Sequence, residues 1–279
     1  MRKIDSKLIT DIVKNMCIEA NIFLGDDIKK CIKENIEIEK NNIGKDILKI
    51  LLENTEKAEE KNIPICQDTG MAVFFVNVGQ DVIIEGDTLT EAINKGVSKG
   101  YTEGFLRKSV VSPIDRINTN DNTPAIIHYD FIKGDKIEIE FAAKGFGSEN
   151  MSALKMLKPS DGIEGIKNFI IETVSNAGPN PCPPTIIGVG IGGTMEKCCE
   201  IAKHALCREL GVHNKDKKIA QLEKELLSEI NKLGIGPQGF GGSTTSLGIN
   251  IETFPTHIAG LPVAVNINCH ASRHKKVII

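Results

Sequence analysis

The hydrophobic residues near the start of the chain recur at helical spacing, with polar residues at the positions between them. The first such stripe begins behind Asp5 or Ser6 as N-cap and comprises Leu8, Ile9, Ile12, Val13, Met16 and Cys17. Gly25 interrupts the pattern, and two further stripes run through residues 28–36 and 43–52. We therefore expect residues 1–60 to form a helical N-terminal part.

Beyond residue 60 the apolar runs are shorter and lie between glycine, proline and polar loops, which is typical of strands. Strands are expected at 71–78, 125–132, 136–143, 185–193, 247–251 and 261–267, and helices behind Asp87, after 144–150, at 162–177, around 198–207 and at 216–233. The two strands around Lys133-Gly134-Asp135 are expected to pair as a hairpin. The predicted fold class is α/β (α+β), with 61–279 forming a mixed β-sheet with flanking helices, and with 1–279 as a single domain.

The composition is that of an ordinary globular protein of 279 residues, with a formal net charge of −3. This charge creates no field that attracts nucleic acid or an anionic membrane. No apolar run approaches the roughly 20 residues of a membrane helix, and the first residues have no apolar signal core. We therefore expect a cytoplasmic protein.

Eight cysteines are present, and no two are spaced as Cys-x-x-Cys. In a cytoplasmic chain this number favours buried thiols and metal ligation over disulfides. Cys17, Cys31, Cys198, Cys199 and Cys207 lie among apolar residues at helical spacing, so we interpret them as packing residues.

The remaining three cysteines share one kind of setting, a polar loop beside an apolar strand. Cys66 lies between Pro64 and Gly70 in a segment that also carries Gln67 and Asp68, although an ordinary turn with a buried thiol would read the same. Cys182 is enclosed by prolines, and Cys269 follows the last predicted strand. Three thiolates without a fourth suggest an iron–sulfur cluster with one iron left open, and their sulfurs should then lie about 6–7 Å apart. A structural zinc site would require a fourth protein ligand, and no histidine is clearly placed to supply it.

Two glycine-rich segments have no obvious role in a core. Residues 144–150 are expected to bring main-chain N–H groups close to a ligand, or to serve as a plain connector. Residues 234–245 contain many glycines and few apolar residues, and we expect their main chain to approach a ligand or to pack closely against another chain.

Five segments together resemble the signature segments of the class I, iron–sulfur-dependent fumarases and L-tartrate dehydratases. They are residues 65–70, 144–150, 180–184, 236–242 and 266–270. The resemblance covers nearly the whole chain and corresponds to the α subunit, or to the N-terminal domain of the fused enzymes. It is specific for the family but not for the substrate.

The resemblance implies a 4Fe–4S cluster held by Cys66, Cys182 and Cys269, and a reversible hydration of a C4 dicarboxylate. Fumarate hydratase is the expected activity, with L-tartrate dehydratase as the alternative. By the same resemblance, the substrate-contacting positions are Gln67, Asp68, Arg107 and Gly147, and the catalytic ones are Asp68 and His257. In the fused enzymes a second domain completes the site, so the resemblance also implies a separate β subunit and a hetero-oligomer.

Two other interpretations remain open at the level of the sequence. Gly188-x-Gly-x-x-Gly193 follows a predicted strand, and Glu209 lies near the acidic position of a dinucleotide-binding fingerprint. A non-catalytic iron–sulfur scaffold would use the three cysteines but has no need for Arg107, Asp68 and His257.

Overall fold

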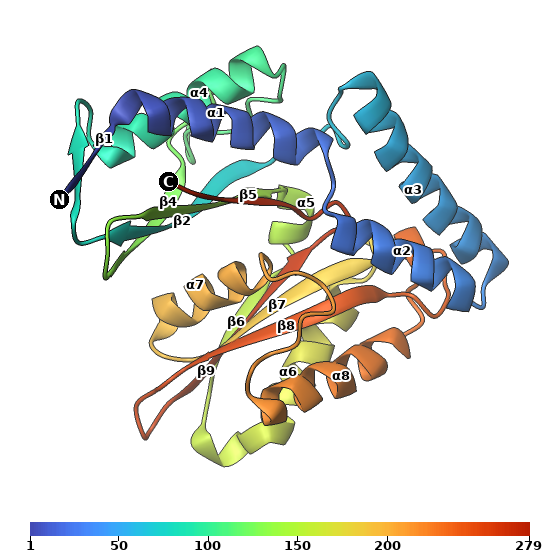
Figure 1. The fold of residues 1–279 in the computed structure, drawn as a ribbon. Helices are drawn as coiled ribbons and strands as arrows, with labels where there is room; N and C mark the ends of the chain where they lie inside the picture. Colours follow the sequence, from blue (N-terminus) through green and yellow to red (C-terminus); the bar gives the residue numbers. More distant parts are fainter. The chain divides into compact units, whose positions relative to one another are not determined.

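The computed structural model describes residues 1–279, which fold into two compact units. The first contains Met1–Leu24, Thr55–Phe146 and Arg273–Ile279, and the second contains Gly25–Asn54 and Gly147–Ser272. The two units interleave along the sequence, so a division at residue 60 does not separate them. The elements form a mixed α/β fold, which confirms the predicted fold class (Figure 1). That 1–279 acts as one functional domain stays a prediction.

The first unit is a four-stranded sheet with the order β10-β5-β2-β4. Its elements are α1 (Ser6–Ile22), β2 (Met71–Gly79), α4 (Leu89–Glu103), β4 (Ile126–Ile132), β5 (Ile137–Lys144) and β10 (Arg273–Ile278), with β1 (Arg2–Asp5) and β3 (Val82–Glu85) as a separate parallel pair. The helix α3 (Asn42–Lys61) contributes residues to both units.

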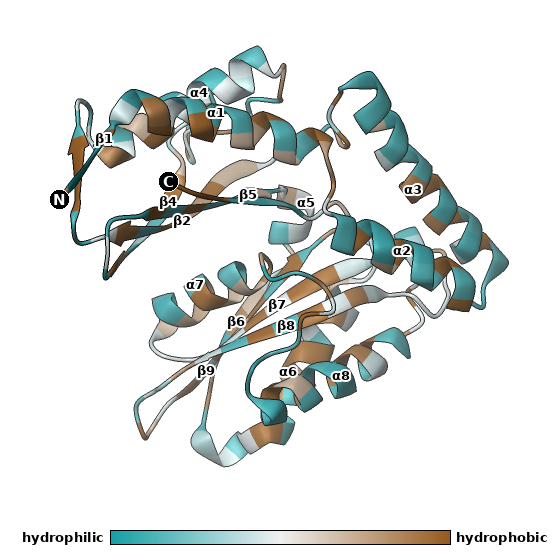
Figure 2. Ribbon diagram, in the orientation of Figure 1, coloured by the Kyte–Doolittle hydropathy of each residue, from teal (hydrophilic) through white to brown (hydrophobic).

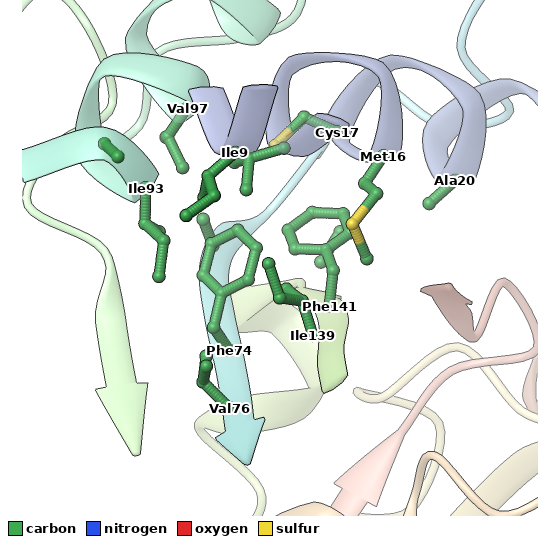
Figure 3. Close-up of a cluster of buried hydrophobic side chains, with 14 of the residues drawn as sticks. Ile9, Met16, Cys17, Ala20, Phe74, Val76, Ile93, Val97, Ile139 and Phe141 are labelled. Atoms are coloured by element: carbon green, nitrogen blue, oxygen red, sulfur yellow. The ribbon is translucent and has the colours of Figure 1, made fainter. Parts of the chain in front are cut away.

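The core of the first unit lies between α1, α4 and one face of this sheet. Alternate residues of β5 are buried, so that its inward positions meet the helical stripes. Figure 3 shows this cluster, with side chains from α1, α4, β2 and β5: Ile9, Met16, Cys17, Ala20, Phe74, Val76, Ile93, Val97, Ile139 and Phe141. Ile9, Val13, Met16 and Cys17 of the predicted first stripe are buried, whereas Leu8 is exposed and Ile12 is half-buried.

The helix α4 begins one residue later than predicted, because Thr88 caps it and not Asp87. The hydroxyl oxygen of Thr88 accepts a hydrogen bond from Glu91 N, and the Glu91 carboxylate accepts one from Thr88 N, which is a capping box. The Asp87 carboxylate pairs instead with Lys95 at 2.6 Å. The prediction of Asp87 as cap was wrong because the hydroxyl of Thr88 reaches the first turn better.

The predicted hairpin around Lys133-Gly134-Asp135 is wrong, although both of its strands exist. Strand β2 lies between them, parallel to β4 and antiparallel to β5. The connection passes around the end of β2, where Gly79 N donates to Lys136 O and Asp81 N donates to Gly134 O. As the most apolar strand, β2 gains most from a central place with neighbours on both edges.

The second unit is a four-stranded sheet with the order β6-β9-β7-β8 and helices on both faces. Its elements are α2 (Asp26–Ile38), α5 (Phe146–Glu149), β6 (Ala153–Leu157), α6 (Gly162–Ala177), β7 (Thr185–Gly192), α7 (Met195–Ala205), α8 (Lys217–Asn231), β8 (Ser246–Phe254) and β9 (Leu261–Asn268). The helices α6 and α8 bury apolar stripes against one face, and α7 packs on the other. Hydrophobic colouring follows the strands of both sheets, whereas α2 and α3 are largely hydrophilic in this view (Figure 2).

The glycines of the dinucleotide-like motif serve helix packing. Gly188 and Gly190 lie inside β7 and not in the turn after it. A Cβ on Gly188 would come within 2.1 Å of Ala202 O, and one on Gly190 within 2.1 Å of Cys198 O. Both positions therefore need glycine so that α7 can approach the sheet, which accounts for the motif without a bound phosphate. No helix combines the length and apolar composition that a membrane span requires.

Candidate functional site

The loop that carries Cys66 is held from several sides by neighbouring elements of the first unit. Ile65 N donates to Asn21 O at 2.9 Å, which fixes the entry of the loop against α1. At its exit, the Tyr101 hydroxyl lies 2.9 Å from Thr69 O and 3.0 Å from Gly70 O. Burial raises the pKa of the Tyr101 hydroxyl, which therefore remains a neutral donor. The half-buried Cys66 thus sits on a rigid loop.

The carboxylate of Asp68 is fixed by two main-chain donors. Its Oδ1 accepts from Gly70 N at 3.0 Å, and its Oδ2 accepts from Phe146 N at 2.9 Å. Gly70 has φ +75°, and a Cβ there would lie 2.8 Å from the main chain of Lys144. Asp68 is half-buried, and each oxygen keeps a second lone pair for another donor.

Arg107 is positioned by the same loop. The hydroxyl of Thr69 accepts from Arg107 N at 2.9 Å and lies 3.2 Å from Arg107 O. These two contacts place the main chain of Arg107 beside the Asp68 loop and leave its guanidinium group exposed. Gln67 is also exposed. The structure therefore brings together Cys66, Gln67, Asp68 and Arg107, as the sequence predicts.

Cys182 and Cys269 lie at the same end of the sheet in the second unit. Strand β7 begins just after Cys182 and runs antiparallel to β9, which ends just before Cys269, with Ile186 opposite Asn268. The ring Nδ1 of His270 is 3.2 Å from Cys182 O. Because a carbonyl only accepts, this contact requires a proton on Nδ1, and it joins the two cysteine loops.

Further contacts brace these two loops. Both the main-chain N and the side-chain Nε2 of Gln238 donate to Pro183 O, each at 2.7 Å. On the other side, Asn268 Nδ2 donates to Ser272 Oγ at 3.0 Å and closes the turn that holds Cys269. The chain therefore presents an exposed Cys182 and a half-buried Cys269 from fixed main chain.

Gln238, His270 and Asn268 were not singled out from the sequence as site residues. Asn266 and Asn268 lie on one face of a buried strand, and both are themselves buried. Buried amides at alternate positions next to a cysteine are the signal that could have indicated a braced turn. Gln238 and Pro183 are 55 residues apart in the sequence, so no local sequence pattern predicts their contact.

The glycine-rich loop 234–245 packs within its own unit, and its contact with a ligand or another chain stays a prediction. A Cβ on Gly242 would lie 2.7 Å from Glu39 Oε1, and one on Gly239 would lie 2.3 Å from the Pro179 side chain. The Glu39 carboxylate, only 5% exposed, accepts hydrogen bonds from Asn41 N and Ser243 N. The glycines therefore let this loop close around a buried carboxylate and against the Cys182 loop.

Glu39 should make the stability of the second unit depend on acid. Burial opposes its ionisation, but the main-chain N–H groups of Asn41 and Ser243 outweigh that and lower the pKa of Glu39 to about 2. A depressed carboxyl pKa adds stability above its unfolded value, near 4.5, and that stability is lost as the pH falls toward 2. We expect a loss of about 3 kcal/mol in the free energy of unfolding over this range.

The measurement is denaturant unfolding between pH 6 and pH 2, comparing the unmodified protein with Glu39→Gln. The variant should be less stable at neutral pH and should show a flatter pH dependence in this range. The exposed Glu37→Gln is the matched control. Identical pH profiles for the unmodified protein and Glu39→Gln would show that Glu39 is not the group responsible.

Gly147 and His257 are the two remaining residues predicted for the site. Gly147 is exposed at the start of the second unit, and a Cβ there would meet no atom closer than 4.0 Å. His257 is exposed in the connection between β8 and β9, at the opposite end of the sheet from Cys182 and Cys269. Strands of eight residues, about 23 Å long, separate these two ends. The structure does not bring His257 to these two cysteines, and its catalytic role stays a prediction.

The other five cysteines differ from the three predicted ligands in burial. Cys17, Cys198 and Cys207 are buried, as predicted for packing residues, and Cys31 is half-buried. Cys199 is exposed, so its assignment to the apolar core was wrong, because it lies on the outer side of α7. Burial raises the pKa of Cys198 to about 12, and burial together with nearby acidic groups raises that of Cys31 to about 11. These two thiols are therefore poor sources of thiolate ligands.

The donor set fits an iron–sulfur cluster. Cys66, Cys182 and Cys269 are the three thiols on loops that are not fully buried, one in the first unit and two in the second. Neither unit by itself gathers three His, Cys, Asp or Glu side chains that could hold a metal ion. The convergence of the three thiols stays a prediction.

Comparison with known proteins gives one consistent family. A family model described as fumarate hydratase (Fumerase) matches residues 10–278. A putative L(+)-tartrate dehydratase subunit alpha of Methanocaldococcus jannaschii is 47% identical over 271 residues, covering 95% of this chain and 95% of that protein. An L(+)-tartrate dehydratase subunit alpha of Escherichia coli is 33% identical over 275 residues, covering 97% and 90%. The chain therefore belongs to the fumarate hydratase (Fumerase) family.

Proposed function

We propose that this chain is the α subunit of an iron–sulfur-dependent hydro-lyase that acts on a C4 dicarboxylate. The observation that carries the proposal is the shared loop of Cys66 and Asp68, fastened through Thr69 to Arg107. This arrangement supports the proposal because it holds the Cys66 thiol, the Asp68 carboxylate and the main chain of Arg107 within one rigid structure. A scaffold subunit would need neither the carboxylate nor the arginine.

Fumarate hydratase is the proposed activity, and L-tartrate dehydratase is the second candidate. The description of the family model favours the first, and the names of the relatives favour the second. Fumarate and tartrate carry two carboxylates at similar spacing. The proposed clamp of Arg107 suits either substrate.

Cys66, Cys182 and Cys269 would hold the 4Fe–4S cluster. When bound, its open iron supplies Lewis acidity toward a substrate hydroxyl. The exposed guanidinium group of Arg107 binds one substrate carboxylate with two parallel hydrogen bonds. The exposed amide of Gln67 is free to orient the same substrate, and Gly147 provides a main-chain N–H.

Asp68 moves the proton at the substrate hydroxyl. Its two oxygens already accept from Gly70 N and Phe146 N, which fixes the direction of the remaining lone pairs. A carboxylate preorganised in this way exchanges a proton without having to reorient. Exclusion of water would strengthen these interactions.

A separate β subunit is proposed to complete the site. Elimination requires a second cation for the other carboxylate and a base for the C3–H, and we assign both to the partner. Near Arg107, the side chains of Phe105, Ile114 and Ile117 are 92%, 87% and 68% exposed. Exposed apolar side chains gathered on one loop are typical of surfaces that a partner covers. Eight free cysteines suit a reducing compartment, and we propose the cytoplasm.

The test is turnover with and without the partner. The chain would be prepared anaerobically, alone and co-expressed with the β subunit of its own source, and assayed with fumarate, L-malate and L-tartrate. We expect hydration or dehydration by the complex and negligible turnover by the chain alone. Full turnover by the chain alone would show that it contains the second clamp and the base. Absence of turnover by the complex on every C4 dicarboxylate would reject the proposed function.

A further inference from the structure

Arg273 is a buried cation that the proposed mechanism does not use. It opens β10 opposite Ala143, and it is only 3% exposed. Its Nη1 donates to Asn21 Oδ1 at 2.9 Å and to Asp68 O at 2.5 Å. Its Nε is buried and has no hydrogen-bond partner. Burial of a charged side chain costs desolvation free energy, and the two neutral acceptors of Arg273 do not neutralise its charge. Such a group is retained for a structural or functional reason.

The same guanidinium group and the carboxylate of Asp68 both lie beside Gly145. A Cβ added to Gly145 would lie 3.1 Å from Asp68 Oδ2 and 3.4 Å from Arg273 Nη2. The carboxylate and the guanidinium group therefore border one small space, which the missing side chain of Gly145 leaves open. Opposite charges around such a space hold one another in place.

Three elements of the first unit meet at this point. Asn21 is fully buried in α1, its carbonyl accepts from Ile65 N, and its side chain accepts from Arg273. Arg273 also donates to Asp68 O. Gly145 directly precedes Phe146, whose main-chain N–H donates to the Asp68 carboxylate. Removal of the guanidinium group would leave Asn21 Oδ1 and Asp68 O without this donor.

We propose that Arg273 is a positioning residue that fixes the Asp68 loop, with its guanidinium group acting on the main chain and the carboxylate of Asp68 and not on substrate. The proposal rests on the proposed function only for its catalytic consequence. Arg273 is also the last residue of the short segment 269–273, which begins at Cys269. The hydrogen bonds of its side chain therefore fix one end of that segment.

The experiment uses Arg273→Met and Arg273→Lys in the full chain with its partner subunit. Lysine keeps the charge, but its side chain is shorter, so its ammonium group does not reach the position of Nη1, the nitrogen that donates to both acceptors. We expect kcat to fall by about 10- to 100-fold, the range for residues that orient the surroundings of a metal site. The KM for the dicarboxylate should change by less than about threefold, because Arg273 does not touch substrate.

A second measurement does not depend on turnover. Amide hydrogen exchange at Gly70 and Phe146 reports the two bonds that hold the Asp68 carboxylate, and both amides should exchange at least about tenfold faster in Arg273→Met. The amides of β7 should be unchanged. Arg208→Met is the control, because Arg208 also has a buried Nε without a partner but pairs with Glu223 in the second unit.

The outcomes separate the alternatives. Unchanged exchange at Gly70 and Phe146 in both Arg273 variants overturns the proposal, as does a rise in KM with kcat intact, which would make Arg273 a substrate ligand. If Arg273→Met does not fold, Arg273→Lys decides by the same two amides. A complex without turnover rejects the proposed function, while the exchange result still decides whether Arg273 positions Asp68.

Discussion

Replacement of Cys182 by alanine is expected to abolish both cluster binding and turnover. Cys182 is exposed on a loop whose main chain is fixed by His270 and Gln238, so we expect the loop to keep its conformation with alanine at this position. Loss of one of three thiolate ligands leaves the cluster without a stable attachment. We expect iron content near zero and a loss of kcat of at least about 1,000-fold, in a chain that still folds.

The matched control for this change is Cys199→Ala. Cys199 is also exposed and lies in the same unit, but it is on α7 and not on a loop. Iron content and kcat should both be unchanged in this variant. The measurements are iron and sulfide analysis, visible absorbance and initial rates on anaerobic protein. Full iron content in Cys182→Ala, or loss of iron in Cys199→Ala, would mean that the ligands are wrongly assigned.

The second large effect is expected from Asp68→Asn. Asparagine keeps the size of the side chain but cannot exchange the proton, so kcat should fall by about 100- to 10,000-fold. The cluster absorbance should remain. One cost is structural, because the amide NH2 must face either Gly70 N or Phe146 N, and that donor loses its acceptor. This loss is worth about 1 kcal/mol of stability.

Asp121→Asn controls for the loss of a carboxylate charge in the same unit. The Asp121 Oδ1 atom accepts from both Thr123 N at 3.0 Å and Thr123 Oγ1 at 2.7 Å, so asparagine can keep both hydrogen bonds. This variant should keep its stability and its kcat. Equal losses of kcat in Asp68→Asn and Asp121→Asn would indicate a general effect of charge, and near-normal kcat in Asp68→Asn would remove Asp68 from the mechanism.

Features that depend on neighbouring residues were predictable from the sequence. The stripes of α1, α2 and α3 and the helix at 162–177 follow from local periodicity, and the structure confirms them. The selection of Asp68 and Arg107 beside Cys66 came from the resemblance to the family and not from local patterns alone. The structure adds the hydroxyl of Thr69 as the group that joins the loops of Asp68 and Arg107.

Features that depend on distant pairing were not predictable. The failed hairpin shows that strand order is decided by which strand gains most from burial, and β2 took the central place. Arg273 and Asn21 are 252 residues apart, so nothing in either neighbourhood indicates that they share a hydrogen bond. The glycine pattern of β7 was ambiguous because close helix packing and phosphate binding both require a missing side chain.

The cluster assignment is tested most directly by iron and acid-labile sulfide analysis of the anaerobically prepared chain with its partner, alongside Cys66→Ala, Cys182→Ala and Cys269→Ala. We expect about four iron and four sulfide ions per chain in the unmodified protein, and loss of both in each variant. Zinc in place of iron, iron without sulfide, or a full cluster in any one of the three variants would contradict the cluster assignment.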